Sequence, residues 1–185
     1  MGEVKILGVS GSGRKGSYNW ALLEAAKEML PENTALEIFD VSRFPLYTQD
    51  HEHDPRVEVQ QFKQKIRQSD AILFATPEHN YTVTAVLKNA IEWGNRPAGN
   101  NSWNGKPAAI VSASSGPRGG ARSQLHLRQI LVDLNMYAIN QPQLLLARAQ
   151  DAFESDLKLK DPQTRETLKT ILQTLAIWTK KINSG

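Results

Sequence analysis

Short apolar runs alternate with helix-like segments along all 185 residues of this chain, and this alternation constrains its fold more than any other feature. Residues 71–75 are apolar throughout, as strands are when both faces of their sheet are covered. Between such runs, apolar residues recur every three or four positions, which is the helical period. Strands and helices that alternate in this way form a parallel sheet with helices on both faces.

The pattern predicts five strands and five helices. We expect strands at residues 4–9, 35–41, 71–75, 108–111 and within 137–146, and helices at 19–30, 82–93 and 121–134. Two more helices should begin where Asp54 and Asp161 each precede a proline, an N-cap followed by the first helical position. Gly94 should end one helix in the left-handed conformation. We therefore predict an α/β fold: one flavodoxin-like domain over residues 1–185, with a doubly wound five-stranded parallel sheet in the order 2-1-3-4-5.

The loop after the first strand carries two competing signals. Gly11, Gly13 and Gly16 form a Gly-x-Gly-x-x-Gly pattern between a strand and a helix, and Asp40 follows 24 residues after Gly16. That arrangement is typical of dinucleotide binding. The same loop also carries hydroxyl, amide and guanidinium groups, which suit a terminal phosphate at a helix N-terminus; they belong to Ser12, Arg14, Ser17 and Asn19. Ser17 could alternatively act only as an N-cap.

The loop after the third strand offers a row of backbone donors. Pro77 fixes the bend, and the residues that follow it could present N–H groups to the polar edge of a flat heterocycle, with Tyr81 as an apolar wall. Glu78 and His79 are candidate acids or bases. For Glu78 we favour a structural role, in which its side chain holds the loop together through bonds to the backbone.

The loop after the fourth strand, residues 112–122, is rich in serine and glycine. Gly119 and Gly120 would let the backbone approach a ligand closely. A flexible glycine-rich linker is the alternative.

Composition excludes several classes of function. The chain has no cysteine, which removes disulfides, thiolate metal sites and cysteine nucleophiles. The net charge of +3 is too small to indicate nucleic acid, although it is compatible with an anionic ligand. No apolar run approaches the roughly 18 residues of a membrane span. We expect a cytoplasmic protein without nucleic-acid or membrane partners.

Taken together, the spaced motifs resemble the NAD(P)H-dependent FMN reductase family. They comprise Gly11-Ser12-x-Arg14-x-x-Ser17-x-Asn19, Thr76-Pro77-Glu78-x-Asn80-Tyr81, residues 87–93 and residues 119–131. Within that family the chain is most similar to bacterial quinone reductases, also described as chromate reductases and azoreductases. The resemblance implies a flavodoxin-like fold, bound FMN, and homodimers that can pair into homotetramers.

The resemblance also implies a set of cofactor-binding residues. The phosphate would contact Ser12, Arg14, Ser17 and Asn19, and the isoalloxazine would contact Pro77, Glu78, His79, Asn80 and Tyr81. Ser114, Gly116 and Arg118 fall in the family's third flavin loop. Two residues depart from the family pattern: His79 stands where tyrosine is common, and Gly13 stands where a larger apolar residue is usual.

The implied mechanism is ping-pong hydride transfer through flavin N5, with no catalytic side chain. NADPH or NADH reduces the flavin and leaves, and a quinone or a similar acceptor, such as an azo dye, chromate or free flavin, then takes two electrons. A flavodoxin-like electron carrier without nicotinamide activity is one alternative, which the basic pI of about 9.2 disfavours. A non-flavin nucleotide-binding module is the other.

Three further groups of residues have competing interpretations. The run His51-Glu52-His53-Asp54 resembles a metal cluster but lacks the spacing of a known site, so we expect no metal. Arg122 and Arg128 are candidates for ion pairs across a subunit interface. Trp93 and Trp103 could line an interface, the flavin pocket or the core.

Overall fold

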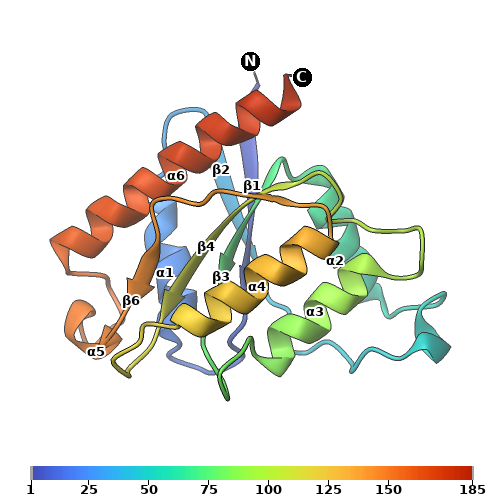
Figure 1. Ribbon diagram of the computed structural model, residues 1–185, viewed down its shortest axis with the longest axis horizontal. Helices are drawn as coiled ribbons and strands as arrows, with labels where there is room; N and C mark the ends of the chain where they lie inside the picture. Colours follow the sequence, from blue (N-terminus) through green and yellow to red (C-terminus); the bar gives the residue numbers. More distant parts are fainter. Residues whose placement is uncertain (1, 185) are drawn as a thin grey trace.

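One parallel sheet organises the computed structural model, which describes residues 2–184 (Figure 1). Its strands follow the order β2-β1-β3-β4-β5, and β6 also pairs with β4. The strands are β1 (Val4–Ser10), β2 (Thr34–Phe39), β3 (Ala71–Ala75), β4 (Pro107–Ala113), β5 (Tyr137–Ala138) and β6 (Leu144–Leu146). The predicted α/β class and strand order are confirmed.

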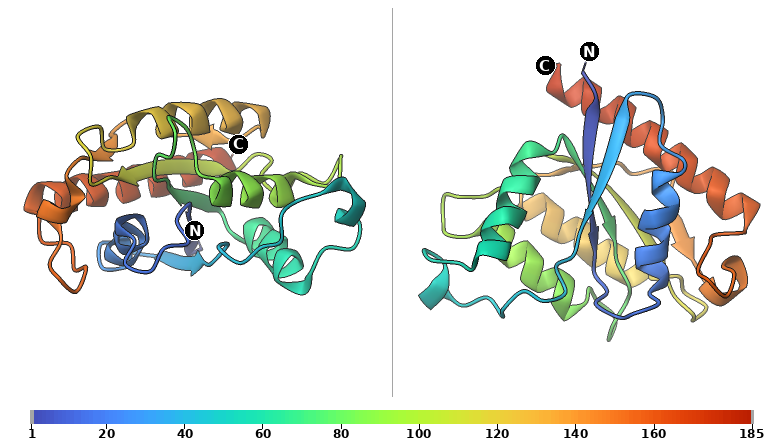
Figure 2. Two further views of the ribbon diagram at one scale, coloured as in Figure 1. Left: turned by 90° about the horizontal axis from the view of Figure 1, so that it is seen from below. Right: turned by 180° about the vertical axis from the view of Figure 1, so that it is seen from behind.

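Helices cover both faces of this sheet. They are α1 (Tyr18–Lys27), α2 (Val57–Gln68), α3 (Ala85–Asn95), α4 (Ala121–Asp133), α5 (Ala149–Ala152) and α6 (Pro162–Asn183). Helices α1 and α6 lie on one face, and α2, α3 and α4 lie on the other (Figure 2). Strand β3 is apolar throughout because its side chains enter two cores. Leu73 packs in the core between the sheet and helices α1 and α6, whereas Ile72 and Phe74 pack in the core between the sheet and helices α2, α3 and α4.

The predicted fifth strand is divided in two. Strands β5 and β6 both pair with β4, at Pro107–Ala108 and at Val111–Ala113 respectively. Pro142 lies in the break between them, and proline has no N–H to donate to a ladder. The prediction of a single strand in this region was therefore wrong, because there are two strands. The predicted position beside the fourth strand was right, since both strands pair with β4.

Gly94 does not end α3 as predicted. The helix continues to Asn95, and the reason for a glycine is packing: a Cβ on Gly94 would overlap the indole of Trp103. Trp103 is fully buried, and its Nε1 donates a hydrogen bond to the Ile91 carbonyl at 3.1 Å. Both Trp103 and Trp93 thus lie in the core.

Of the two predicted Asp-Pro helix starts, one is confirmed. Asp161 caps α6, because its Oδ2 accepts a bond from the Thr164 N–H at 2.7 Å. Asp54 does not cap α2, which begins at Val57 after Arg56. A short 3₁₀ turn at Gln49–His51 precedes it, and the Asp54 N–H continues that turn by donating to the His51 carbonyl.

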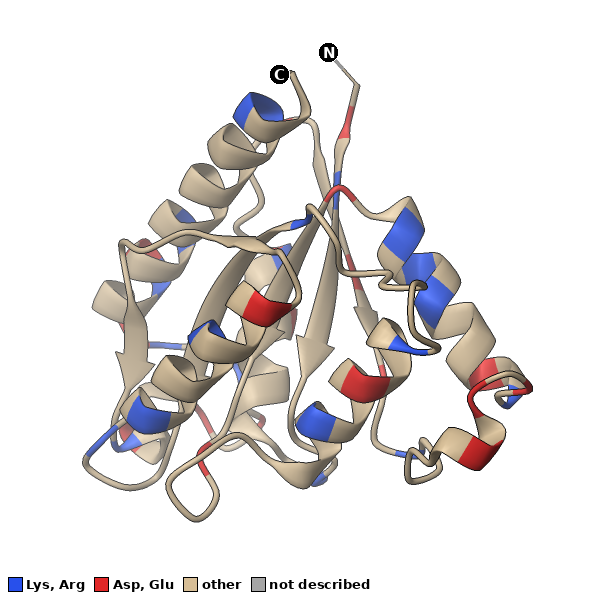
Figure 3. Ribbon diagram, turned by 45° about the vertical axis from the view of Figure 1, so that its right-hand side comes forward, with Lys and Arg blue, Asp and Glu red and all other residues tan. Residues whose placement is uncertain are grey.

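Basic residues are concentrated in the second half of α2 (Figure 3). They are Lys63, Lys65 and Arg67. Positive charge near a helix C-terminus complements the helix dipole. Among residues 2–184, no helix is both long enough and apolar enough to cross a membrane.

Candidate cofactor site

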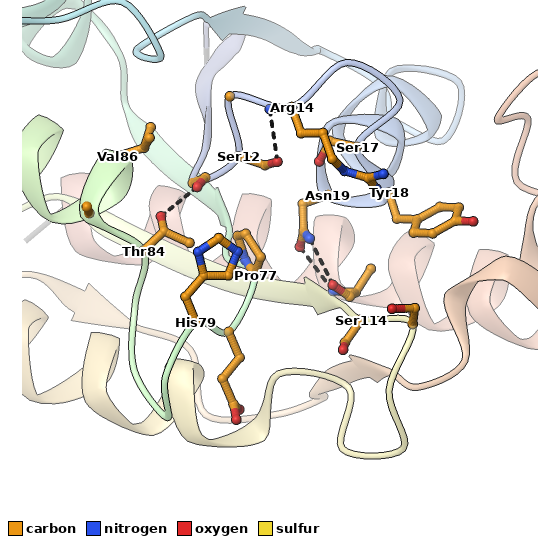
Figure 4. Close-up of a pocket in the computed structure, with 16 residues that line it drawn as sticks. Ser12, Arg14, Ser17, Tyr18, Asn19, Pro77, His79, Thr84, Val86 and Ser114 are labelled. Carbon is orange, nitrogen blue, oxygen red and sulfur yellow. Dashed lines mark hydrogen bonds between the residues drawn. The ribbon is translucent and has the colours of Figure 1, made fainter.

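The carboxyl ends of β1, β3 and β4 meet at one edge of the sheet, and the three loops that follow them surround a cavity of about 540 Å³ (Figure 4). This volume falls within the usual range of small-molecule sites, about 300–1,000 Å³. The cavity lies where the strand order reverses, between β1 and β3, which is the expected position of a ligand in an open α/β sheet.

The loop between β1 and α1 supplies the polar end of the cavity. Ser12, Arg14 and Ser17 all line it. Ser17 is also the N-cap of α1, because its Oγ accepts a bond from the Trp20 N–H at 3.3 Å. The positive end of a helix and an arginine side chain therefore face the same space, an arrangement that favours a phosphate group.

Asn19 lines the cavity, but its side chain has another partner. Its Nδ2 donates to the Ala113 carbonyl at 2.8 Å, and its Oδ1 accepts from the Ala113 N–H at 3.0 Å (Figure 4). The buried amide thus ties the start of α1 to the end of β4. It fixes the spacing between the first and third loops of the site.

The loop after β3 sends only part of its predicted set into the cavity. Pro77, Glu78 and His79 line it, whereas Asn80 and Tyr81 do not. Asn80 and Tyr81 have positive φ angles of 47° and 71°, and both residues are exposed. The His79 N–H is bonded to the Thr82 carbonyl, which removes it from the predicted row of free donors.

Glu78 is held by an arginine from α4. Its Oε2 accepts from the Arg122 backbone N–H at 3.0 Å, and its Oε1 accepts from Arg122 Nε at 2.7 Å. Burial would raise the pKa of Glu78, but the hydrogen bonds and the charge of Arg122 outweigh burial and hold that pKa below its usual value. The geometry supports the bracing role and not that of a general acid.

The loop after β4 contributes Ser114 and Ser115 to the cavity, but not Gly116 or Arg118. The glycines that follow serve packing within the fold: a Cβ on Gly119 would overlap the backbone carbonyl of Leu145. Gly119 packs against Leu145 of β6, and Gly120 packs against Ser112 of β4. Neither glycine lines the cavity, and their predicted close approach to a ligand stays a prediction.

Some lining residues were missed in the sequence. They are Tyr18, Thr84, Ala85, Val86, Ala113 and Ser115. Thr84 is the N-cap of α3, accepts from the Leu87 N–H at 3.2 Å and donates to the Gly11 carbonyl. A threonine directly before an apolar helical segment is a recognisable N-cap signal, and it would have placed the helix start correctly.

The other candidate residues have partners within the chain. Glu52 accepts a bond from the Tyr47 hydroxyl at 2.7 Å, and no three side chains of metal-binding type come together within the described residues 2–184. Arg128 donates to the Ile139 carbonyl at 2.9 Å. Arg122 forms an ion pair with Glu78 within the chain.

Residues 4–151 of this chain match the protein family described as NADPH-dependent FMN reductase. The chain belongs to that family. Members of this family use FMN together with NAD(P)H. FMN is therefore the cofactor that we compare with the cavity at the ends of β1, β3 and β4. The family also sets this oxidoreductase apart from a pure electron carrier, because its description names a nicotinamide reductant.

Relatives agree with this assignment along nearly the whole chain. The NAD(P)H-dependent FMN reductase of Pseudomonas aeruginosa is 44% identical over 183 residues, which cover 97% of each chain. A quinone reductase of Pseudomonas putida is 42% identical over 173 residues, 93% of this chain and 92% of that protein. The flavoenzyme NAD(P)H:(acceptor) oxidoreductase FerB of Paracoccus denitrificans has a solved structure that matches with a TM-score of 0.88 at 30% identity, covering 96% of this chain and 98% of its own.

Proposed function

We propose that this FMN-dependent NAD(P)H oxidoreductase reduces quinones or similar small acceptors. The observation that carries the proposal is the cavity itself, in which the α1 N-terminus, Arg14 and two serines face the space that the β3 loop closes at its other end. The quinone reductases among its relatives support quinones as the acceptor class. Azo dyes, chromate and free flavin are further candidates.

The residues present fit FMN. Ser12, Arg14 and Ser17 offer hydroxyl and guanidinium donors at a helix N-terminus, which is the donor set that a phosphate monoester needs. Pro77 and His79 would border the ring. Gly11 leaves room for this arrangement, because a Cβ there would press at 3.1 Å against both Leu87 and Pro77.

Bound FMN would supply the redox chemistry, by accepting a hydride from the nicotinamide and passing two electrons to the acceptor. The chain itself binds and orients. Arg14 would hold the phosphate end, the buried amide of Asn19 would keep the first and third loops at a fixed spacing, and the wall of Pro77 would exclude water from one side. No side chain needs to act as an acid or base for the hydride step.

Anaerobic reduction of the purified holoprotein tests the proposal. NADPH or NADH should bleach the flavin absorbance, and quinone added afterwards should restore it. A panel of quinones, an azo dye, chromate and free FMN would then rank the acceptors. A flavin that stays oxidised with both nucleotides would contradict the proposal and favour an electron carrier, and a colourless protein that binds no FMN would favour a non-flavin nucleotide module.

A further inference from the structure

Helix α4 and the cofactor loop after β3 are joined by a carboxylate. Gly120 occupies the N-cap position of α4 and has no side chain with which to cap it. The Glu78 carboxylate takes that place, since it accepts from the Arg122 backbone N–H at 3.0 Å. A negative charge at a helix N-terminus is favourable. The first turn of α4 and the wall of the cavity are therefore one structural unit.

The Arg122 side chain adds a second and a third contact. Its Nε donates to Glu78 Oε1 at 2.7 Å, and its guanidinium carbon lies 3.5 Å from the centre of the Tyr81 ring. The Glu78 side chain is 10% exposed and that of Arg122 is 28% exposed, so the ion pair is mostly shielded from water. The guanidinium group of Arg122 therefore contacts both ends of the segment from Glu78 to Tyr81.

That segment needs external support. Asn80 and Tyr81 have consecutive positive φ angles of 47° and 71°, a conformation that residues with side chains adopt only when their surroundings impose it. Two backbone bonds between His79 and Thr82 close the turn, each at 3.0 Å. A second tie runs to α4 one turn further on, where His126 Nδ1 lies 2.9 Å from Thr82 Oγ1.

We propose that Arg122 is a positioning residue that sets the shape of the isoalloxazine-binding loop from α4. It does not line the cavity, so it acts through Glu78 and Tyr81. We call these three residues the Arg122 clamp. This inference rests on the proposed function only in that the loop borders the flavin ring. It predicts that α4 controls the affinity for the ring and not the affinity for the phosphate.

The clamp requires a guanidinium and not merely a positive charge. A planar fork can donate to a carboxylate along one edge while its face stacks on an aromatic ring, whereas an ammonium group cannot do both. Arg122→Lys should therefore fail to replace arginine. Arg128→Lys is the matched control, because Arg128 lies on the same helix and donates to the Ile139 carbonyl, away from the loop.

The test compares the binding of FMN and riboflavin to the apoprotein by flavin fluorescence. Arg122→Lys and Arg122→Gln should weaken both ligands by the same factor, roughly ten-fold, which is typical for the loss of a charged hydrogen bond. Hydrogen exchange in residues 76–83 should become faster. Arg128→Lys should change neither measurement.

Unchanged affinity for both flavins in the Arg122 variants would overturn the proposal, as would a loss for FMN alone, which would place Arg122 at the phosphate. If the Arg122 variants do not fold, Tyr81→Ala tests the same clamp from its exposed end, and unchanged riboflavin affinity there would overturn it. Failure of the proposed function gives a different result, because the unmodified protein would then bind no flavin or would not oxidise NAD(P)H.

Discussion

Arg14 and Lys15 are adjacent basic residues in the loop between β1 and α1, but of the two only Arg14 lines the cavity. A charge-assisted hydrogen bond contributes about 1.5–3 kcal/mol. We therefore expect Arg14→Ala to weaken FMN binding roughly ten- to hundred-fold and to leave riboflavin binding intact. Titration of the apoprotein with both flavins checks this, with Lys15→Ala as the control. Unchanged FMN affinity in Arg14→Ala would contradict the assignment of the phosphate site to this loop.

Glu78→Gln should retain substantial turnover at saturating FMN. The amide keeps the shape of the carboxylate and one acceptor oxygen for Arg122, and the hydride step requires no proton from this residue. Steady-state rates with NADPH and a quinone measure the effect. A fall of several orders of magnitude, with flavin still bound, would instead identify Glu78 as an acid or base.

The lowered pKa of Glu78 makes the stability of the fold depend on pH. Because the pKa in the folded state lies below its usual value, the ionised carboxylate stabilises the fold fully above that usual value, and this contribution is lost as the pH falls through the lowered one. Thermal melts between about pH 3 and pH 7 should show wild-type protein more stable than Glu78→Gln above about pH 4.3. The gap should shrink at lower pH, and a gap that stays constant across this range would refute the ion pair.

At this scale the sequence predicts chemical groups better than partners. Serine and arginine in the first loop were predicted as phosphate donors because they lie next to a helix start in the sequence, and both types of residue line the cavity. The partner of Glu78 lies 44 residues away and that of Asn19 lies 94 away, so both pairings depend on the completed fold. Asn80 and Tyr81 could not be excluded from the cavity in advance, since no glycine marks their positive φ angles.

At the scale of elements, the alternation of strands and helices and the length of the chain predicted the strand order, but the ends of the elements depended on neighbouring residues. The same Asp-Pro pair starts α6 at Asp161 but does not start α2 at Asp54, which belongs to the turn that follows a 3₁₀ helix and lies before the first residue of α2, Val57. Gly94 illustrates the same limit, because its role is set by Trp103 and not by the helix end.

Gly94→Ala should therefore destabilise the protein, although alanine favours a helix by about 1 kcal/mol over glycine. Overpacking a rigid core costs about 1–3 kcal/mol, and the added methyl group would meet a fully buried indole that is hydrogen-bonded to Ile91. Urea unfolding should show a net loss of stability. In a Trp103→Phe background the same substitution should cost less, and an equal cost in both backgrounds would mean that the indole is not the obstacle.

At the scale of the whole molecule, α4 presents an apolar surface that the chain does not cover. Leu125 and Val132 are 60% and 78% exposed and lie two helical turns apart, and Tyr81 in the cofactor loop is 64% exposed. A cavity that is open on one side would gain a wall from a neighbouring subunit, and two-fold pairing is the commonest assembly. These observations support the prediction that the chain forms at least a homodimer, with the two cofactor sites near the interface; its place in the cytoplasm stays a prediction.

Light scattering on the purified protein tests whether the chain forms a homodimer. We expect a mass of at least twice the 20.6 kDa of one chain at micromolar concentration, because burying large exposed side chains contributes about 25 cal/mol per Å². Val132→Asp should shift the mass toward the monomer, since a charge would then be buried without a partner, whereas Ile177→Asp is a matched control on α6, where Ile177 is also exposed. A fully active monomer would refute the homodimer, and dissociation by Ile177→Asp but not by Val132→Asp would move the interface from α4 to α6.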